Sequence, residues 1–180
     1  MQIDTDQLKS YGQILAEGMQ YAAAYDFSEL KPTIKLGVKL CRKGAMLPEV
    51  TEGNAGIDLR VLTANGEESV EIVPNGTYTF YTGIKMDIPE GYYIEVVPRS
   101  STGIKKTLRL MNTSAVLDSS WKGETLVAIH NFGQKPVTVL NNERLCQMIL
   151  HKVEPVRIEE VDDVGDSERG EKGIGSTGRI

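Results

Sequence analysis

The segment Ile34-Lys-Leu-Gly-Val-Lys-Leu40, IKLGVKL, alternates apolar and polar residues. This period of two is typical of a β-strand with one buried face. Similar short runs follow, separated by turn signals such as Ala64-Asn-Gly66 and Pro74-Asn-Gly76. We predict these further strands over residues 57–61, 70–73, 78–86, 92–97, 116–117, 126–131, 137–140 and 145–153. Since no helix of ordinary length fits between them, the sequence predicts an all-β sandwich, jelly roll or barrel.

The two ends of the chain differ from this β body. In residues 4–25, apolar side chains recur at three- and four-residue spacing, which predicts a helix that buries its stripe against the domain or another chain. Beyond Pro155, acidic residues and glycines replace large apolar ones, which predicts a tail without a core. We therefore divide the chain into an N-terminal helical extension (1–32), a β domain (33–155) and a flexible C-terminal arm (156–180).

The composition argues against several classes of protein. A formal net charge of −5 does not suit a broad nucleic-acid or anionic-membrane surface, although a local basic pocket remains compatible with it. The cysteines, Cys41 and Cys146, have neither metal-ligand nor disulfide spacing, and His130 and His151 show no partner spacing, so no zinc site is expected. Because we find no signal peptide and no long apolar run, we expect a cytoplasmic protein that does not enter a membrane.

Residues 112–124, NTSAVLDSSWKGE, are the first candidate for a functional site. Asp118 follows a strand-like run, a polar turn and Trp121 come next, and the chain resumes as an apolar strand over residues 126–129. This pattern predicts a β-hairpin with an acid and a large aromatic residue at its mouth, where they could face a small ligand. Taken alone, an ordinary polar turn would also account for these residues.

Other stretches carry groups suited to phosphate or cations. Arg99, which ends a strand, is followed by hydroxyl residues, and the arm combines Arg169 with glycines and hydroxyls that can approach phosphate oxygens. Asp58 lies inside an apolar strand, where an acid needs a partner or a cation, and Gln147 stands between apolar neighbours. Each has an ordinary alternative, namely a surface loop, an ion pair or a disordered terminus.

In their order and approximate spacing, these stretches closely resemble the five motifs of deoxyuridine triphosphatases (dUTPases), which share a superfamily with the dCTP deaminases. The matching segments are Ala55–Leu59, Pro98–Ser101, Ala115–Glu124, Asn142–Gln147 and Arg169–Gly178. The resemblance covers roughly residue 34 to the C-terminus and implies a jelly-roll-like distorted β-barrel. It also implies a homotrimer with active sites between subunits, over which the arm closes. The implied reaction converts dUTP and water to dUMP and pyrophosphate, with Mg²⁺ as cofactor.

The resemblance implies three catalytic residues. Asp118 matches the acid that orients and deprotonates the attacking water, a general-base role that suits a carboxylate. Gln147 matches the glutamine near the α-phosphate. Asp58 matches an acid that organises the site and reaches the metal through water. No residue is therefore expected to bind Mg²⁺ directly, and the substrate phosphates would hold the ion.

The resemblance further implies a set of substrate-binding residues. Asn112, with the backbone of Val116 and Leu117, matches the segment that reads uracil. Trp121 matches the residue under the deoxyribose, where its ring would leave no room for a 2′-hydroxyl. The remaining implied contacts are Arg99, Ser100, Ser101, Arg169, Ile174, Gly175, Ser176 and Thr177.

Three residues depart from the family pattern. Trp121 replaces the usual tyrosine, Ile174 replaces a phenylalanine that stacks on uracil, and Ala115 stands where glycine is common. These departures concern sugar discrimination, closure of the arm and the shape of the hairpin, and none removes a catalytic group.

Two alternatives stay open. A dCTP deaminase shares the scaffold and the Arg-Ser-Ser loop, but the position of its deaminating glutamate is best matched by Ala128, which has no carboxylate. A non-catalytic regulatory or binding protein could use residues 1–30 as a helix that binds a protein partner. The favoured expectation is an enzyme that acts on dUTP and binds no nucleic acid directly.

Overall fold

The computed structural model describes residues 34–172 of the chain. The predicted helix over residues 4–25 lies outside this range, as do the predicted arm contacts Ile174, Gly175, Ser176 and Thr177. Among the helices of the described residues, none has the length and apolar character that crossing a membrane requires.

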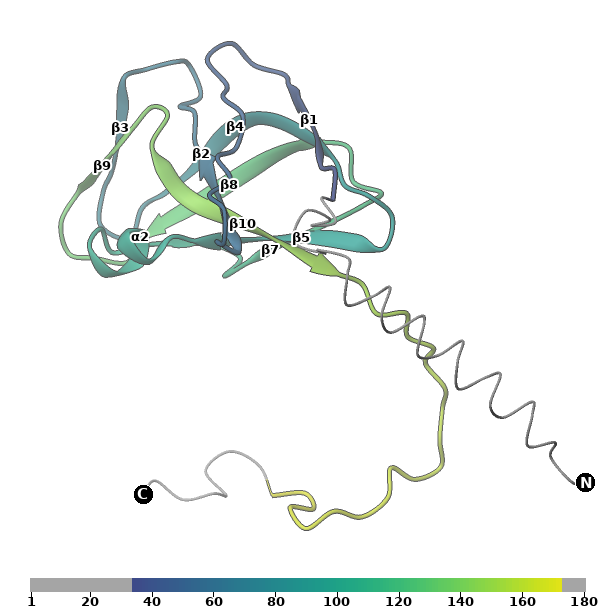
Figure 1. Ribbon diagram of the computed structural model, residues 1–180. Coiled ribbons are helices and arrows are strands. Elements are labelled where there is room, and N and C mark those ends of the chain that lie inside the picture. Colours follow the sequence, from purple (N-terminus) through teal and green to yellow (C-terminus); the bar gives the residue numbers. More distant parts are fainter. Residues whose placement is uncertain (1–33, 173–180) are drawn as a thin grey trace, which may run out of the picture.

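Short β-strands form the body of the protein (Figure 1). In chain order the elements are β1 (Gly37–Leu40), β2 (Gly56–Arg60), β3 (Ser69–Ile72), β4 (Thr77–Asp87), β5 (Tyr92–Pro98), α2 (Ser100–Ile104), β6 (Leu108–Leu110), β7 (Ala115–Asp118), β8 (Glu124–Asn131), β9 (Val137–Leu140) and β10 (Arg144–Lys152). They make two four-stranded sheets, β1-β4-β8-β6 and β2-β10-β5-β7, and a small sheet of β3 and β9. All the pairings are antiparallel, and the architecture confirms the predicted all-β, jelly-roll-like fold.

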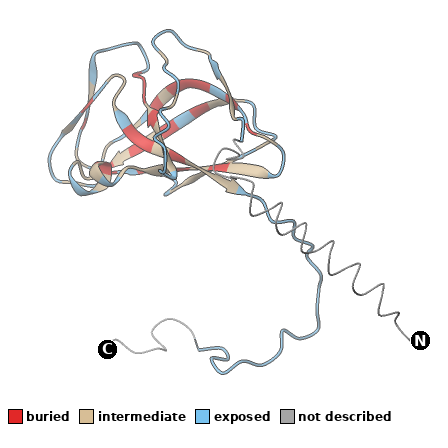
Figure 2. Ribbon diagram, in the orientation of Figure 1, coloured by how far each residue is buried: buried red, intermediate tan, exposed pale blue. Residues whose placement is uncertain are grey.

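The two larger sheets share one apolar core (Figure 2). Phe80 and Ile84 of β4 and Ile94 of β5 are completely buried, and they pack in one cluster with Met148 of β10. Cys146 belongs to the same core, where burial raises the pKa of its thiol to about 12. Because the thiolate is the disfavoured form there, Cys146 acts as a small apolar core residue.

The opposite face of the sheet β2-β10-β5-β7 is more polar. The register places Gln147 across from Asp58 on one side and from Val97 on the other, while Tyr93 lies across from His151 and Asp118. Residues two apart on a strand point to the same face, so these side chains share the face that turns away from the core. We call it the outer face of the second sheet.

The predicted hairpin across residues 112–124 is wrong. β7 pairs with β5, whereas β8 pairs with β4 and β6, so the chain crosses from one sheet to the other at residues 119–123. A polar turn between two strand-like runs does not reveal whether the strands pair or lie in opposite layers. β8 alternates buried residues such as Val127 and Ile129 with more exposed ones, and this long strand completes the sheet of β4.

After β10 the chain leaves the body. Residues 153–172 are exposed and contain no strand, and Figure 1 shows them running away from the β sheets. Near the end of the described range, Arg169 lies in an exposed turn, where its Nε donates a hydrogen bond to the Lys172 carbonyl oxygen at 3.0 Å.

Candidate active site

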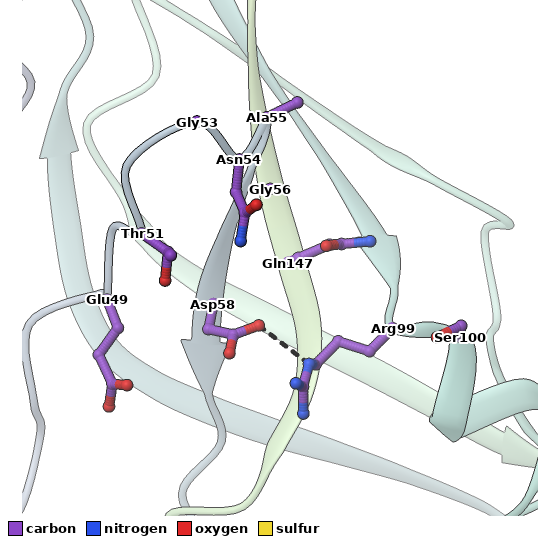
Figure 3. A pocket seen from close by; sticks show the side chains of 10 residues that line it. All are labelled: Glu49, Thr51, Gly53, Asn54, Ala55, Gly56, Asp58, Arg99, Ser100 and Gln147. Atoms are coloured by element: carbon purple, nitrogen blue, oxygen red, sulfur yellow. Dashed lines mark ion pairs between the residues drawn. The ribbon is translucent and has the colours of Figure 1, made fainter.

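A polar cavity of about 450 Å³ opens where β2, β5 and β10 come together (Figure 3). It brings together predicted site residues from three separate segments: Asp58 from β2, Arg99 and Ser100 from the junction between β5 and α2, and Gln147 from β10. The other residues that line it are Glu49, Thr51, Gly53, Asn54, Ala55 and Gly56. The antiparallel pairing of β10 with both β2 and β5 explains why these distant segments meet.

Asp58 is held by two arginines. Its Oδ1 lies 2.9 Å from Nε of Arg99, and its Oδ2 lies 3.1 Å from Nη1 of Arg144. The sequence left open whether this acid meets a partner or a cation, and the structure supplies guanidinium partners. Charge-assisted contacts of this kind fix the direction of a side chain. Asp58 therefore holds Arg99 in position at the cavity, as the dashed line in Figure 3 indicates.

Glu49 is a cavity residue that the sequence did not predict. Its Oε1 accepts hydrogen bonds from Nε and Nη2 of Arg60 at 3.1 and 2.5 Å, and its Oε2 lies 3.3 Å from Arg144. The hydrogen-bonded Arg60 guanidinium holds the pKa of Glu49 below its usual range. With Asp58 and Arg99, this network joins three guanidinium groups to two carboxylates. The surplus positive charge suits an anionic ligand.

The position of the Gln147 side chain depends on a glycine. A Cβ at Gly56 would stand 2.2 Å from Oε1 of Gln147, so the amide occupies the space of a missing side chain. Both residues line the cavity, and the strands that carry them are paired. Gly56 therefore allows Gln147 to lie along β2.

Replacing Gly56 by alanine should move Gln147 and lower kcat/KM by about 10- to 100-fold, because small displacements of positioning groups are costly. The contact involves the flexible end of one side chain, so the thermal midpoint should change little. Steady-state kinetics and thermal unfolding measure the two effects. In a Gln147→Ala background, the same glycine substitution should have little further effect. A further full-sized loss there would contradict the assigned contact.

The hydroxyl residues after Arg99 serve different purposes. Ser100 lines the cavity, but Ser101 is not among its lining residues. Thr102 is buried, and its Oγ1 donates a hydrogen bond to the Leu145 carbonyl oxygen at 2.7 Å. Thr102 thus fastens the short helix α2 to β10.

Asp118 lies away from the cavity. It sits opposite Tyr93 on β5, whereas Gln147 sits opposite Val97, four positions away. Four residues of an antiparallel strand span about 13 Å, and β5 also separates β7 from β10. Asp118 and Gln147 therefore mark opposite ends of the outer face. Arg169 is likewise not among the residues that line the cavity.

Two of the predicted uracil-reading residues, Val116 and Leu117, directly precede Asp118 on β7, whereas Asn112 lies before the other end of that strand. Asn112 occupies an exposed turn between β6 and β7, in which Thr113 has a φ of +62°. β-Branched residues rarely adopt this left-handed conformation, and such strain concentrates at functional sites. Val116 is exposed, while Leu117 packs against the core.

The crossover of residues 119–123 is anchored at both ends. The backbone N–H of Trp121 donates a hydrogen bond to the Asp118 carbonyl oxygen at 3.0 Å. At the other end, Oε1 of Glu124 accepts hydrogen bonds from Nε of Arg42 at 2.7 Å and from the Gly83 N–H at 3.0 Å. Between these anchors Trp121 is 51% exposed, so a large aromatic surface lies beside Asp118.

The model of the dUTPase family matches residues 42–178. The chain belongs to the dUTPase family. The deoxyuridine 5'-triphosphate nucleotidohydrolase of Fusobacterium nucleatum is 40% identical to it over 147 residues, which cover 81% of this chain and 99% of that protein. The protein of the same name from Finegoldia magna is 36% identical over 128 residues, covering 71% of this chain and 87% of that protein. These similarities confirm the predicted family and the prediction that the protein is an enzyme.

Solved dUTPases share the fold. The dUTPase of Staphylococcus bacteriophage 80alpha with dUPNHPP superposes with a TM-score of 0.71 at 24% identity, covering 81% of this chain and 99% of that one. A dUTPase from phage phi11 of S. aureus, in which a structural Mg(II) ion is coordinated, gives a TM-score of 0.65 at 18% identity. It covers 74% of this chain and 100% of that one. At these identities the likeness establishes the common β fold.

Proposed function

We propose that this dUTPase-family enzyme hydrolyses dUTP to dUMP and pyrophosphate at sites shared between the subunits of a homotrimer. One observation carries the proposal. Asp58, Arg99, Ser100 and Gln147 meet at one cavity whose arginine network has surplus positive charge, as a triphosphate site requires.

The distance between Asp118 and the cavity supports a shared site. A general base must come within hydrogen-bond reach of the proton it takes, at about 2.6–3.2 Å between heavy atoms or through one water. The separation of Asp118 from Gln147 on the outer face is several times larger. A second copy of the chain can bring its own Asp118 to the cavity, and a third can supply the arm that carries Arg169.

Each residue then has a chemical task. Arg99 and Ser100 donate hydrogen bonds to phosphate oxygens, and Gln147 orients the α-phosphate. Asp118 of a neighbouring subunit takes a proton from water while the water oxygen bonds to the α-phosphorus. The bond from that phosphorus to the bridging oxygen breaks, and pyrophosphate leaves. Trp121 forms the floor under the deoxyribose, and Asn112 with the adjacent backbone reads uracil.

The carboxylates at the cavity suit a hydrated Mg²⁺ ion better than a directly bound one. Residues 34–172 contain no group of three or more His, Cys, Asp or Glu side chains that could hold a metal. Asp58 and Glu49 already pair with arginines, so they would reach the ion through its waters. Mg²⁺ commonly keeps several waters and binds substrate phosphates, where it supplies charge neutralisation.

A substrate panel tests the proposed reaction. With Mg²⁺, we expect pyrophosphate chiefly from dUTP and little from dCTP, dTTP or UTP, because the uracil and sugar contacts reject the other nucleotides. Pyrophosphate and ammonia are measured together. Ammonia from dCTP would assign the protein to the deaminase branch. If no nucleotide gave a product, the hypothesis of a non-catalytic binding protein would replace that of an enzyme.

A further inference from the structure

Trp121 lies against a backbone position that has no side chain. A Cβ at Gly123 would stand 2.3 Å from Cζ2 of the indole and 2.8 Å from Cε2 and Cη2. These atoms belong to the six-membered ring of the indole. The ring therefore occupies the space that any side chain at position 123 would fill.

The backbone beneath the indole has little freedom to withdraw. The crossover is tied to Asp118 at one end and, through Glu124, to Arg42 and Gly83 at the other. The side chain of Glu124 is only 16% exposed, so this anchor is shielded from water. The three nearest contacts of an added Cβ would all be with the Trp121 ring. The ring would therefore have to move, and to reach ordinary van der Waals separation it would shift by about 1.5 Å.

The exposure of Trp121 agrees with a ring that has one covered and one open face. About half of the residue surface is accessible, although part of the ring rests on Gly123. An aromatic ring held in this way offers a flat apolar surface at low entropic cost, because the space beneath it admits few other orientations.

We propose that Gly123 is a positioning residue that fixes the Trp121 indole as the floor under the sugar, and that it thereby contributes to the selection of deoxyribose over ribose. The effect on selectivity rests on the proposed function, whereas the placement of the ring does not. A glycine at this position lets a tryptophan lie close to the backbone, where a larger residue would push the indole into the space of the sugar or away from it.

The test is Gly123→Ala in the full-length protein. Trp121 is the only tryptophan, so its emission and its quenching by acrylamide report the position of the ring before any nucleotide is added. Both should differ from the parent protein. The KM for dUTP should rise roughly three- to tenfold, the range of one aromatic contact. The preference for dUTP over UTP should fall by a similar factor. We expect a smaller change in kcat, because the pairing of β7 with β5 holds Asp118 independently.

A matched pair of variants separates ring placement from a general disturbance. Trp121→Tyr provides a smaller ring without the fused second ring that overlies Gly123. In that background Gly123→Ala should change the KM for dUTP and the preference for dUTP over UTP very little. The effects of the two substitutions should therefore be strongly non-additive. Thermal unfolding checks that all the variants fold.

Each outcome decides a different point. Unchanged emission and quenching in Gly123→Ala would overturn the placement of the ring. A displaced ring with unchanged KM and unchanged sugar preference would overturn its role under the sugar. Additive losses in the double variant would show that Gly123 acts otherwise than through the indole. If the parent protein failed to hydrolyse dUTP, the proposed function would fall, while the nucleotide-free fluorescence would still decide the placement of the ring.

Discussion

Asp118→Asn is expected to lower kcat for dUTP by about 10²- to 10⁴-fold, the usual contribution of a positioned general base. Asparagine preserves the shape of the side chain but cannot take the proton of the attacking water. Asp118 lies on an exposed strand end, so folding and nucleotide binding should persist. Pyrophosphate release measures turnover, and the fluorescence of Trp121 measures binding. Unchanged turnover would contradict the general-base role.

Mixed oligomers make this prediction sharper. Asp118→Asn and Gln147→Ala chains, each expected to be nearly inactive alone, should recover activity when they are co-expressed. In such an assembly some sites combine an intact Asp118 from one chain with an intact Gln147 from another. With random mixing in a cyclic oligomer, about one site in four is restored. If both groups acted within the same chain, no site would be restored.

Truncation after Gly165 is the second change from which we expect a large effect. It removes Arg169 and the predicted donors Ser176 and Thr177, and the loss of a single well-placed donor already costs about 10²- to 10³-fold in kcat. The β sheets end at Lys152, and residues 153–172 are exposed, so the thermal midpoint of the body should be preserved. Turnover and thermal unfolding of the shortened protein test the two statements.

A shorter deletion provides the matched control for the arm. Removing only Arg179 and Ile180 leaves the Gly-Ser-Thr-Gly segment intact and should leave turnover close to that of the full chain. Full activity after truncation at Gly165 would show that the arm does not take part in catalysis. An unfolded truncated protein would instead assign the arm a structural role.

The sequence was informative about strands because their pattern is local. Alternation in β5 places Ile94 and Val96 in the core and leaves Tyr93 and Glu95 more exposed, which the period of two already indicates. The short elements α2 and β6 contain five and three residues and are too short to show a period. Their existence depends on packing against β10 and β8, which no local pattern reveals.

The pairing of the strands was harder to predict from the sequence. The sequence of residues 112–124 predicts a hairpin, yet β7 and β8 belong to different sheets. The choice depends on which neighbour buries each strand, and this is a property of the whole core. The same limitation applies to the candidate site. The motifs named Asp58, Arg99 and Gln147, which line one cavity in the structure, but their order gave no indication that Asp118 lies at the other end of the sheet.

Glu49 illustrates a different limitation. Its segment has no strand alternation, and a single acid in a loop carries no signal of its own. It reaches the cavity because Glu49 and Asp58 exchange backbone hydrogen bonds of 3.2 and 3.1 Å across an isolated bridge. Only then does its carboxylate meet Arg60 and Arg144.

The buried thiol of Cys146 has a practical consequence for labelling. Thiol reagents attack the thiolate, and burial keeps that form of Cys146 scarce and out of reach. Cys41, the other cysteine, is partly exposed and directly precedes Arg42, which anchors Glu124. A maleimide dye should therefore attach at a single position without any cysteine being replaced. The native chain thus offers one attachment point for a dye close to the anchor of the crossover, and Trp121 within that crossover serves as an intrinsic energy donor.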